Sequence, residues 1–157
     1  MHIDFQAGRI DAGEGALLAQ AMRDEMAEVY PGLVLDDPGM PKAGPAELSP
    51  PTGAFLVGWA DGVAVCCGGL KALPDGACEI KRMYVVPEAR RQGVARRLLR
   101  ALEDEARRLG YPVARLDTGP RQPHAKALYA GEGYVEVANF NGNPVADYFA
   151  EKPLSGL

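Results

Sequence analysis

A short segment near the middle of the chain combines arginines, a glycine and the start of a helix. Residues 90–95 read Arg-Arg-Gln-Gly-Val-Ala, and the apolar spacing that follows predicts a helix from Gly93 to Leu109. The first turn of a helix leaves backbone N–H groups without intrahelical partners, and these groups favour anions. A glycine here lets a phosphate approach the backbone closely. The segment therefore predicts a pyrophosphate-binding site.

Positive charge is concentrated around this segment. Residues 81–108 contain nine basic and four acidic side chains, a net +5, whereas the whole chain carries a net charge of −4. This contrast indicates a local site for an anion, and a solvated helix face is the alternative. The chain contains neither G-x-x-x-x-G-K-[ST] nor G-x-G-x-x-G, so the common ATP and NAD signatures are missing. The acidic balance of the whole chain argues against a nucleic-acid binder.

Two motifs, in the correct order and with a predicted strand between them, resemble the GCN5-related N-acetyltransferase (GNAT) family. Residues 79–95 read EIKRMYVVPEARRQGVA. Their last six residues match the family's acetyl-CoA-binding pattern [RQ]-x-x-G-x-[GA], which opens a helix after the fourth strand. Residues 122–134 read QPHAKALYAGEGY and resemble N-x-x-A-x-x-L-Y-x-x-x-G-[FY]. Gln122 stands where asparagine is usual, so its amide is one methylene longer.

The resemblance implies an N-acetyltransferase that uses acetyl-CoA as its cosubstrate and transfers the acetyl group directly to a primary amine. The acceptor would be a small molecule, a peptide or a protein. Pantetheine would lie in a gap between two splayed strands and pair with exposed backbone near Met83 and Val85. The residues that the resemblance assigns to cosubstrate binding are Met83, Tyr84, Val85, Arg90, Arg91, Gln92, Gly93, Val94, Ala95, Arg96, Gln122 and Lys126.

Two side chains are the catalytic candidates. Tyr129 matches the tyrosine of the second motif and would protonate the leaving thiolate, because a phenol with a pKa of roughly 10 keeps its proton at neutral pH. The alternative is a tyrosine that only packs in the core. Glu79 resembles the family's glutamate base. Strand alternation would place Glu79, Lys81, Met83 and Val85 on one face, which leaves a base, an ammonium anchor and an ion pair with Lys81 all open.

The elements that must position these residues form an α/β (α+β) pattern in one domain, residues 1–157. Strands are expected at 3–5, 54–60, 63–73, 78–86, 113–117, 134–138 and 146–151, and helices at 14–30, 93–109 and 123–132. The resemblance implies a GNAT-type mixed, mostly antiparallel sheet of about 6–7 strands flanked by about 4 helices. Strands 78–86 and 113–117 would be its splayed parallel pair.

The proline-rich loop Pro31–Pro51 occupies the position where the family builds the acceptor pocket. Its acidic residues Asp36, Asp37 and Glu47 would suit a cationic amine, and a solvated acidic loop explains them equally well. The first 15 residues carry Asp4, Asp11 and Glu14 and no long apolar core, unlike a secretory signal.

The remaining composition narrows the class of protein. The chain has three cysteines, and this odd number favours a cytoplasmic protein with reduced thiols. It has only two histidines and no C-x-x-C pair, so we expect no metal site. No apolar run approaches the ~20 residues that a membrane span needs. Family members are often dimers, so a homodimer is one expectation. The alternative functions are a non-catalytic acyl-CoA-binding module or sensor, and a transferase that uses another short acyl-CoA.

Overall fold

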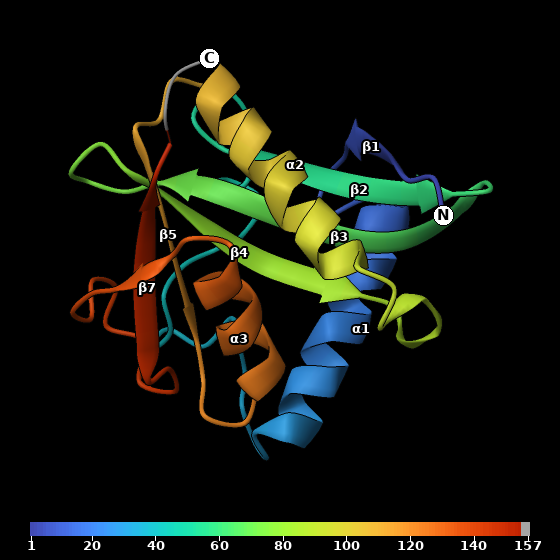
Figure 1. Ribbon diagram of the computed structural model, residues 1–157. Helices are drawn as coiled ribbons and strands as arrows, with labels where there is room; N and C mark the ends of the chain where they lie inside the picture. The colour runs from blue at the N-terminus through green and yellow to red at the C-terminus, as the bar shows by residue number, and fades with distance from the viewer. Residues whose placement is uncertain (155–157) are drawn as a thin grey trace.

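Seven strands form one mixed sheet in the computed structural model, which describes residues 1–154 (Figure 1). The strands are β1 (Asp4–Ala7), β2 (Ala54–Ala60), β3 (Val63–Ala72), β4 (Cys78–Val85), β5 (Val113–Thr118), β6 (Val135–Glu136) and β7 (Tyr148–Pro153). Their order across the sheet is β1-β2-β3-β4-β5-β7-β6. Only β4 and β5 run parallel, and the other neighbours are antiparallel. The predicted mostly antiparallel sheet with one parallel pair is confirmed.

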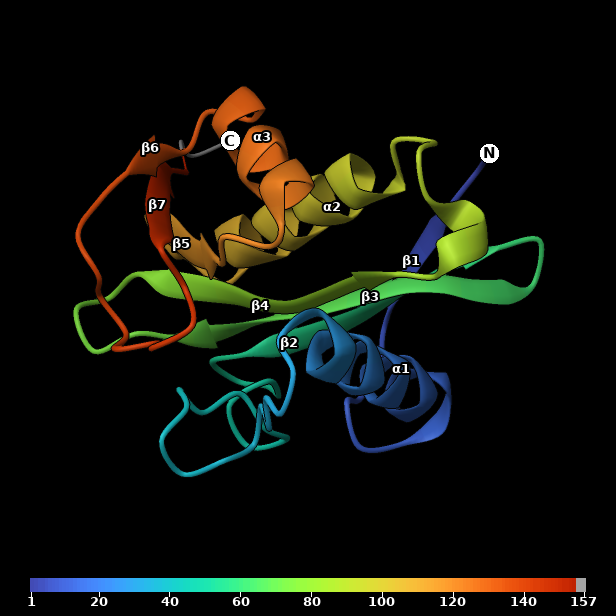
Figure 2. The same cartoon turned by 90° about the horizontal axis from the view of Figure 1, so that it is seen from below.

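Helices cover both faces of this sheet. The helix α1 (Gly13–Val29) packs on one face together with the loop of residues 30–53, and α2 (Val94–Arg108) and α3 (Pro123–Gly131) pack on the other (Figure 2). A 3-10 turn, η1 (Pro87–Ala89), links β4 to α2. The loop of residues 30–53 contains no helix or strand, as its prolines predict.

Local sequence explains the two elements nearest the predicted anion site. The apolar stripe of α2 is buried at Val94, Leu98, Leu102 and Ala106, which fixes the rotation of the helix on the sheet. Gly93 precedes the helix in the left-handed conformation (φ +75°), where a glycine pays no steric cost. The helix therefore starts one residue later than predicted, with Gly93 as its N-cap.

A bulge in β4 overturns one expectation from strand alternation. Lys81 pairs with Gly69 and Tyr84 with Cys67, so two residues of β4 stand opposite Gly68 alone. The extra residue is Arg82, whose φ is +61°. Alternation consequently changes phase. Met83 and Val85 pack with the core beneath α2, whereas Tyr84 packs with the core beneath α1. The prediction that Glu79, Lys81, Met83 and Val85 share one face was wrong.

The parallel pair separates soon after it forms. β4 and β5 pair only at Cys78 with Ala114 and at Glu79 with Arg115. Beyond these positions β5 and β7 turn steeply away from β4, and α3 lies beside the gap (Figure 1). The edge of β4 from Ile80 onward therefore has no neighbouring strand on the β5 side. The predicted splayed pair is present.

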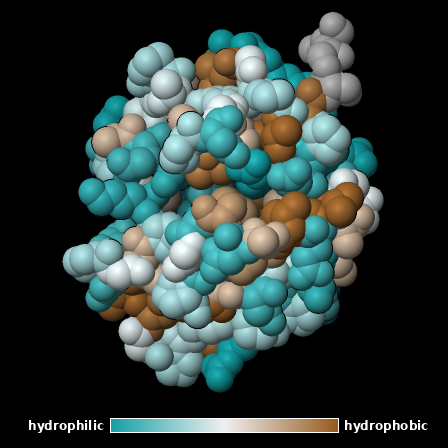
Figure 3. All heavy atoms as spheres, turned by 90° about the vertical axis from the view of Figure 1, so that its left-hand side faces the viewer, coloured by the Kyte–Doolittle hydropathy of each residue, from teal (hydrophilic) through white to brown (hydrophobic). Residues whose placement is uncertain are grey.

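The described surface carries its apolar residues in scattered positions. The most exposed large apolar side chains come from five separate segments: Met1, Leu17, Val34, Val63 and Val135. Figure 3 shows the molecule from the left-hand side of Figure 1. On this one face, apolar spheres lie closer together and form a band among hydrophilic ones. Within residues 1–154, no helix is both long enough and apolar enough to cross a membrane.

Candidate active site

The backbone at the start of α2 forms an open anion cradle. No side chain caps this helix end, so the N–H groups of its first turn have no side-chain acceptor. A Cβ built on Gly93 would meet no atom within 4 Å, so there is open space in front of the backbone. Free amides, a helix dipole and open space together fit a phosphate group.

The arginines around this cradle have different local partners. The Arg90 guanidinium donates to the carbonyl oxygen of Val85 at 2.9 Å and pairs with Glu25 of α1 at 2.6 Å. Arg96 pairs with Glu132 at 3.1 Å. In the described part of the chain, Arg91 has no such ion pair, and its φ is +63°. The backbone amides, with Arg91 beside them, are therefore the groups most available to an anion.

Further along β4, one edge of the strand is available to a ligand. The Val86 N–H donates to the carbonyl oxygen of Val65 in β3 at 2.9 Å. Because backbone groups alternate along a strand, the N–H of Val85 faces the opposite edge, towards the gap left by β5. An edge of this kind offers N–H and C=O groups that an amide-containing ligand can pair with. This edge matches the position expected for pantetheine near Met83 and Val85.

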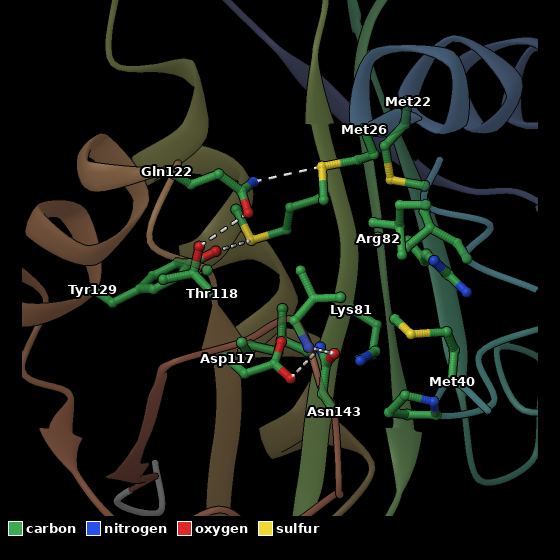
Figure 4. A pocket seen from close by; sticks show the side chains of 18 residues that line it. Met22, Met26, Met40, Lys81, Arg82, Asp117, Thr118, Gln122, Tyr129 and Asn143 are labelled. Carbon is green, nitrogen blue, oxygen red and sulfur yellow. Dashed lines mark hydrogen bonds between the residues drawn. The ribbon is translucent and has the colours of Figure 1, made fainter. Parts of the chain in front are cut away.

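A cavity of about 130 Å³ opens beside the gap. It is lined by α1, the loop of residues 30–53, β4, the end of β5, α3 and the loop before β7 (Figure 4). Its apolar wall includes Met22, Met26, Leu33, Leu35 and Met40, and its polar side chains include Lys81, Arg82, Asp117, Thr118, Gln122 and Asn143. The loop thus supplies apolar groups to this cavity, and its Asp36 instead pairs with Arg23 at 3.0 Å.

Tyr129 borders the cavity from α3. Its side chain is largely buried, and its hydroxyl lies 3.9 Å from the sulfur of Met83 on the bulge of β4. Burial raises the pKa of the Tyr129 phenol, and the nearby Asp117 raises it further. The phenol therefore keeps its proton over the whole neutral range and can donate it. The structure brings Tyr129 and the open edge of β4 together, as the second motif led us to expect.

Two carboxylates lie close together at the root of the gap. Nδ2 of Asn141 donates to Oε2 of Glu79 and to Oδ2 of Asp117, both at 2.7 Å. Asn143 donates a second bond to Asp117 at 3.0 Å. The Glu79 side chain is fully buried and pairs with Lys81 at 3.3 Å, a contact that the sequence left open as one of three alternatives. Asp117 lines the cavity and Glu79 does not, so Asp117 is the carboxylate that borders the open space.

The other predicted binding residues lie around α3. The side-chain oxygen Oε1 of Gln122 accepts hydrogen bonds from the hydroxyl groups of Tyr30 and Thr118, both at 3.4 Å. These bonds connect the start of α3 to β5 and to the end of α1. The Lys126 ammonium lies over the ring of Tyr148, 5.3 Å from its centre. Gln122 lines the cavity and Lys126 does not.

Sequence reasoning missed three polar residues of this site. Asp117 was predicted only as the end of a strand, and Asn141 and Asn143 lie in the segment between the predicted strands 134–138 and 146–151, to which no role was assigned. A carboxylate at the carboxyl end of a parallel strand, next to an expected splay, was the available signal for Asp117. A third asparagine in the same turn, Asn139, accepts hydrogen bonds through Oδ1 from the backbone N–H groups of Asn141 and Gly142. The turn therefore orients the side-chain amides of Asn141 and Asn143.

The sequence of this chain matches one known protein family. The model of the acetyltransferase (GNAT) family matches residues 19–134. The chain therefore belongs to the GNAT family and is an N-acetyltransferase. The family uses acyl-CoA, and the cradle on α2 and the open edge of β4 fit that donor.

Individual relatives agree with this assignment. An IAA acetyltransferase from Azospirillum brasilense is 39% identical over 110 residues, which cover 68% of this chain and 72% of the relative. A solved structure from Klebsiella pneumoniae, described as an acyl-CoA N-acyltransferase, is 30% identical with a TM-score of 0.78 and covers 98% of both chains. The PaiA N-acetyltransferase from Thermoplasma acidophilum in complex with coenzyme A shares the fold at 16% identity. Its TM-score is 0.69, with 98% of this chain and 99% of that chain covered.

Proposed function

We propose that the protein transfers the acetyl group of acetyl-CoA directly to a primary amine bound in the cavity. The observation that carries this proposal is the separation of β4 from β5, which leaves the edge of β4 open between the α2 cradle and the cavity. A donor that pairs with this edge would place its thioester beside Tyr129. The donor supplies an activated acyl group, so the protein has to position two substrates and move protons.

The proposed transfer assigns a role to each group at the gap. The C–N bond of the amide forms while the C–S bond of the thioester breaks. The acceptor ammonium must first lose one proton to become a nucleophile. A second proton leaves the nitrogen after attack, and the thiolate gains one. Tyr129 protonates the sulfur and regains a proton from solvent before the next turnover, and the N–H of Val85 stabilises the carbonyl oxygen as it becomes negative.

The carboxylates hold and deprotonate the amine in this proposal. Asp117 lines the cavity and is the group that an ammonium meets. Glu79 acts from behind it through Asn141, whose amide contacts both carboxylates. Glu79 is therefore a positioning residue for proton removal, and its other partner is the Lys81 ammonium at 3.3 Å.

Release of free thiol from acetyl-CoA across a panel of amines tests the proposal. The buried cysteines do not interfere, because burial raises the pKa of Cys66 to about 11 and those of Cys67 and Cys78 to about 12. We expect thiol release that depends on the amine and an acetylated amine as the product. Propionyl-CoA in a parallel assay separates acetyl preference from general short-acyl use. Coenzyme A binding without amine-dependent thiol release would instead indicate a non-catalytic acyl-CoA sensor.

A further inference from the structure

A buried arginine borders the cavity at the bulge of β4. The Arg82 side chain is only 6% exposed, and its Nε donates a long hydrogen bond of 3.4 Å to the carbonyl oxygen of Ala43. One terminal nitrogen lies 3.7 Å from Oδ1 of Asp36, beyond ordinary hydrogen-bond length. Within residues 1–154, the two terminal nitrogens thus donate no hydrogen bond to a protein acceptor. Neither nitrogen is fully buried, so their four N–H groups are available to a ligand.

The charges on this side of the cavity do not balance. Asp36 is the carboxylate nearest to Arg82, and it already pairs with Arg23 at 3.0 Å while its side chain stays 55% exposed. Two guanidinium groups therefore share one carboxylate. Burial lowers the pKa of Arg82, because the cation has lost much of its hydration. A second carboxylate would supply the missing charge and accept the free N–H groups in a bidentate pair.

The opposite side of the cavity has the complementary chemistry. Asp117 and Asn143 lie across the cavity from Arg82 (Figure 4). Asp117 can accept an ammonium, as the proposed function requires. Met22, Met26 and Met40 form part of the apolar wall of the cavity, and the Lys81 side chain lies between Arg82 and Asp117 (Figure 4). An anion-binding group, an ammonium-binding group and apolar residues around them match a zwitterion with an apolar side chain.

We propose that the acceptor is a free α-amino acid with an apolar side chain, whose carboxylate binds Arg82 and whose amine lies at Asp117. This inference rests on the proposed function and names the substrate class of its acceptor site. The bulge positions Arg82 for this role. It adds one residue to β4, gives Arg82 its positive φ and turns the Arg82 side chain to the α1 side of the sheet.

Matched pairs of acceptors that differ only in the carboxylate test the proposal. L-leucine is compared with 3-methylbutylamine, L-methionine with 3-(methylthio)propylamine and L-phenylalanine with 2-phenylethylamine. We expect kcat/KM to be at least about 10-fold higher for the amino acid of a pair, because a charge-assisted hydrogen bond to Arg82 is lost with the carboxylate. Equal use of both members, or preference for the plain amine, would overturn the proposal.

Arg82→Gln removes the guanidinium and keeps a polar side chain at the bulge. We expect KM for the amino acid to rise about 10- to 100-fold while KM for the matched amine stays within about 3-fold. Arg107→Gln is the control, because Arg107 lies on α2 and pairs with Asp104. An unchanged thermal shift with coenzyme A verifies that the Arg82 variant is folded. Equal losses for amino acid and amine would show that Arg82 is merely structural.

Calorimetric titration of L-leucine, L-methionine and L-phenylalanine into the protein–coenzyme A complex separates the two proposals. Binding that weakens at least about 10-fold in Arg82→Gln supports the amino acid site, even if no amine releases thiol and the proposed transfer fails. Acetylation of amines without any Arg82-dependent amino acid binding overturns the amino acid site and leaves the proposed transfer in place. Absence of both overturns both.

Discussion

At the scale of single residues, Tyr129 and Tyr134 show how environment separates two similar side chains. Both rings are buried, and their centres lie 6.0 Å apart. The Tyr134 hydroxyl donates to the buried Glu103 at 2.8 Å, which is a complete structural hydrogen bond. The Tyr129 hydroxyl has only the weak sulfur acceptor of Met83 at 3.9 Å and borders the cavity. Only Tyr129 is therefore available to a substrate.

Tyr129→Phe should lower kcat and leave the coenzyme A thermal shift almost unchanged. The change deletes one hydroxyl and preserves the packing of the ring. General-acid catalysis is worth ~10²–10⁴-fold, and we expect the low end because a thiolate leaves fairly well unaided. Steady-state kinetics with the best acceptor measures the effect. Tyr134→Phe is the matched control and should reduce stability more than kcat. Parental turnover in Tyr129→Phe would return Tyr129 to a purely packing role.

Asp117→Asn and Glu79→Gln distinguish the carboxylate at the cavity from the one behind it. We expect both variants to lose turnover at neutral pH, with the larger loss for Asp117→Asn, because Asp117 lines the cavity. Part of the loss should be recovered as pH rises, since the free amine then becomes abundant without help from the protein. The pH–rate curves of the two variants and the parent measure this. If the pH–rate curve of Glu79→Gln coincided with that of the parent, Glu79 would have no part in proton removal and would only form an ion pair with Lys81.

At the scale of the elements, the sequence predicted the strands and helices better than the faces they present. Hydrophobic period and turn residues located β2 and the helices within about a residue, because those signals are local. The bulge at Arg82 could not be predicted, since it depends on Gly68 of β3 leaving space for Met83. A Cβ on Gly68 would approach Met83 at 3.2 Å and Leu102 at 2.9 Å. The sequence alone therefore could not identify Arg82 as a residue of the site.

The start of α2 is an element whose function depends on one backbone conformation. Gly93→Val should remove most of the coenzyme A thermal shift, because a side chain would occupy the space in front of the amides. The same change also strains the backbone, since Gly93 has a φ of +75° that a β-branched residue adopts poorly. Gly93→Asn separates the two effects, because asparagine tolerates this conformation yet still fills the space. A folded asparagine variant with the parental shift would contradict the cradle.

At the scale of the whole molecule, the site exists because the sheet divides. The α2 cradle belongs to one side of the gap, and α3 with Tyr129 stands at the other. On the opposite face, α1 and the loop of residues 30–53 cover β4 (Figure 2) and contribute residues to the cavity lining. A donor on the α2 cradle and an acceptor in the cavity would thus contact different elements of the fold. The motifs predicted the donor side, whereas the acceptor side combines residues from six segments that no single spacing connects.

Donor binding should therefore stabilise the fold as a whole, by linkage to the native state. Coenzyme A at 100 times its dissociation constant should add ~2.7 kcal/mol to the free energy of unfolding. For a chain of this size that corresponds to a rise of roughly 5–10 °C in Tm, measured by a thermal melt. Pantetheine can pair with the edge of β4 but lacks the pyrophosphate that the α2 cradle would bind. At the same concentration it should give a clearly smaller shift, and Gly93→Asn should reduce the coenzyme A shift to about the pantetheine value. If pantetheine and coenzyme A shifted the parent equally, the phosphates would not be bound at α2, and the open edge of β4 would have to account for all of the donor affinity.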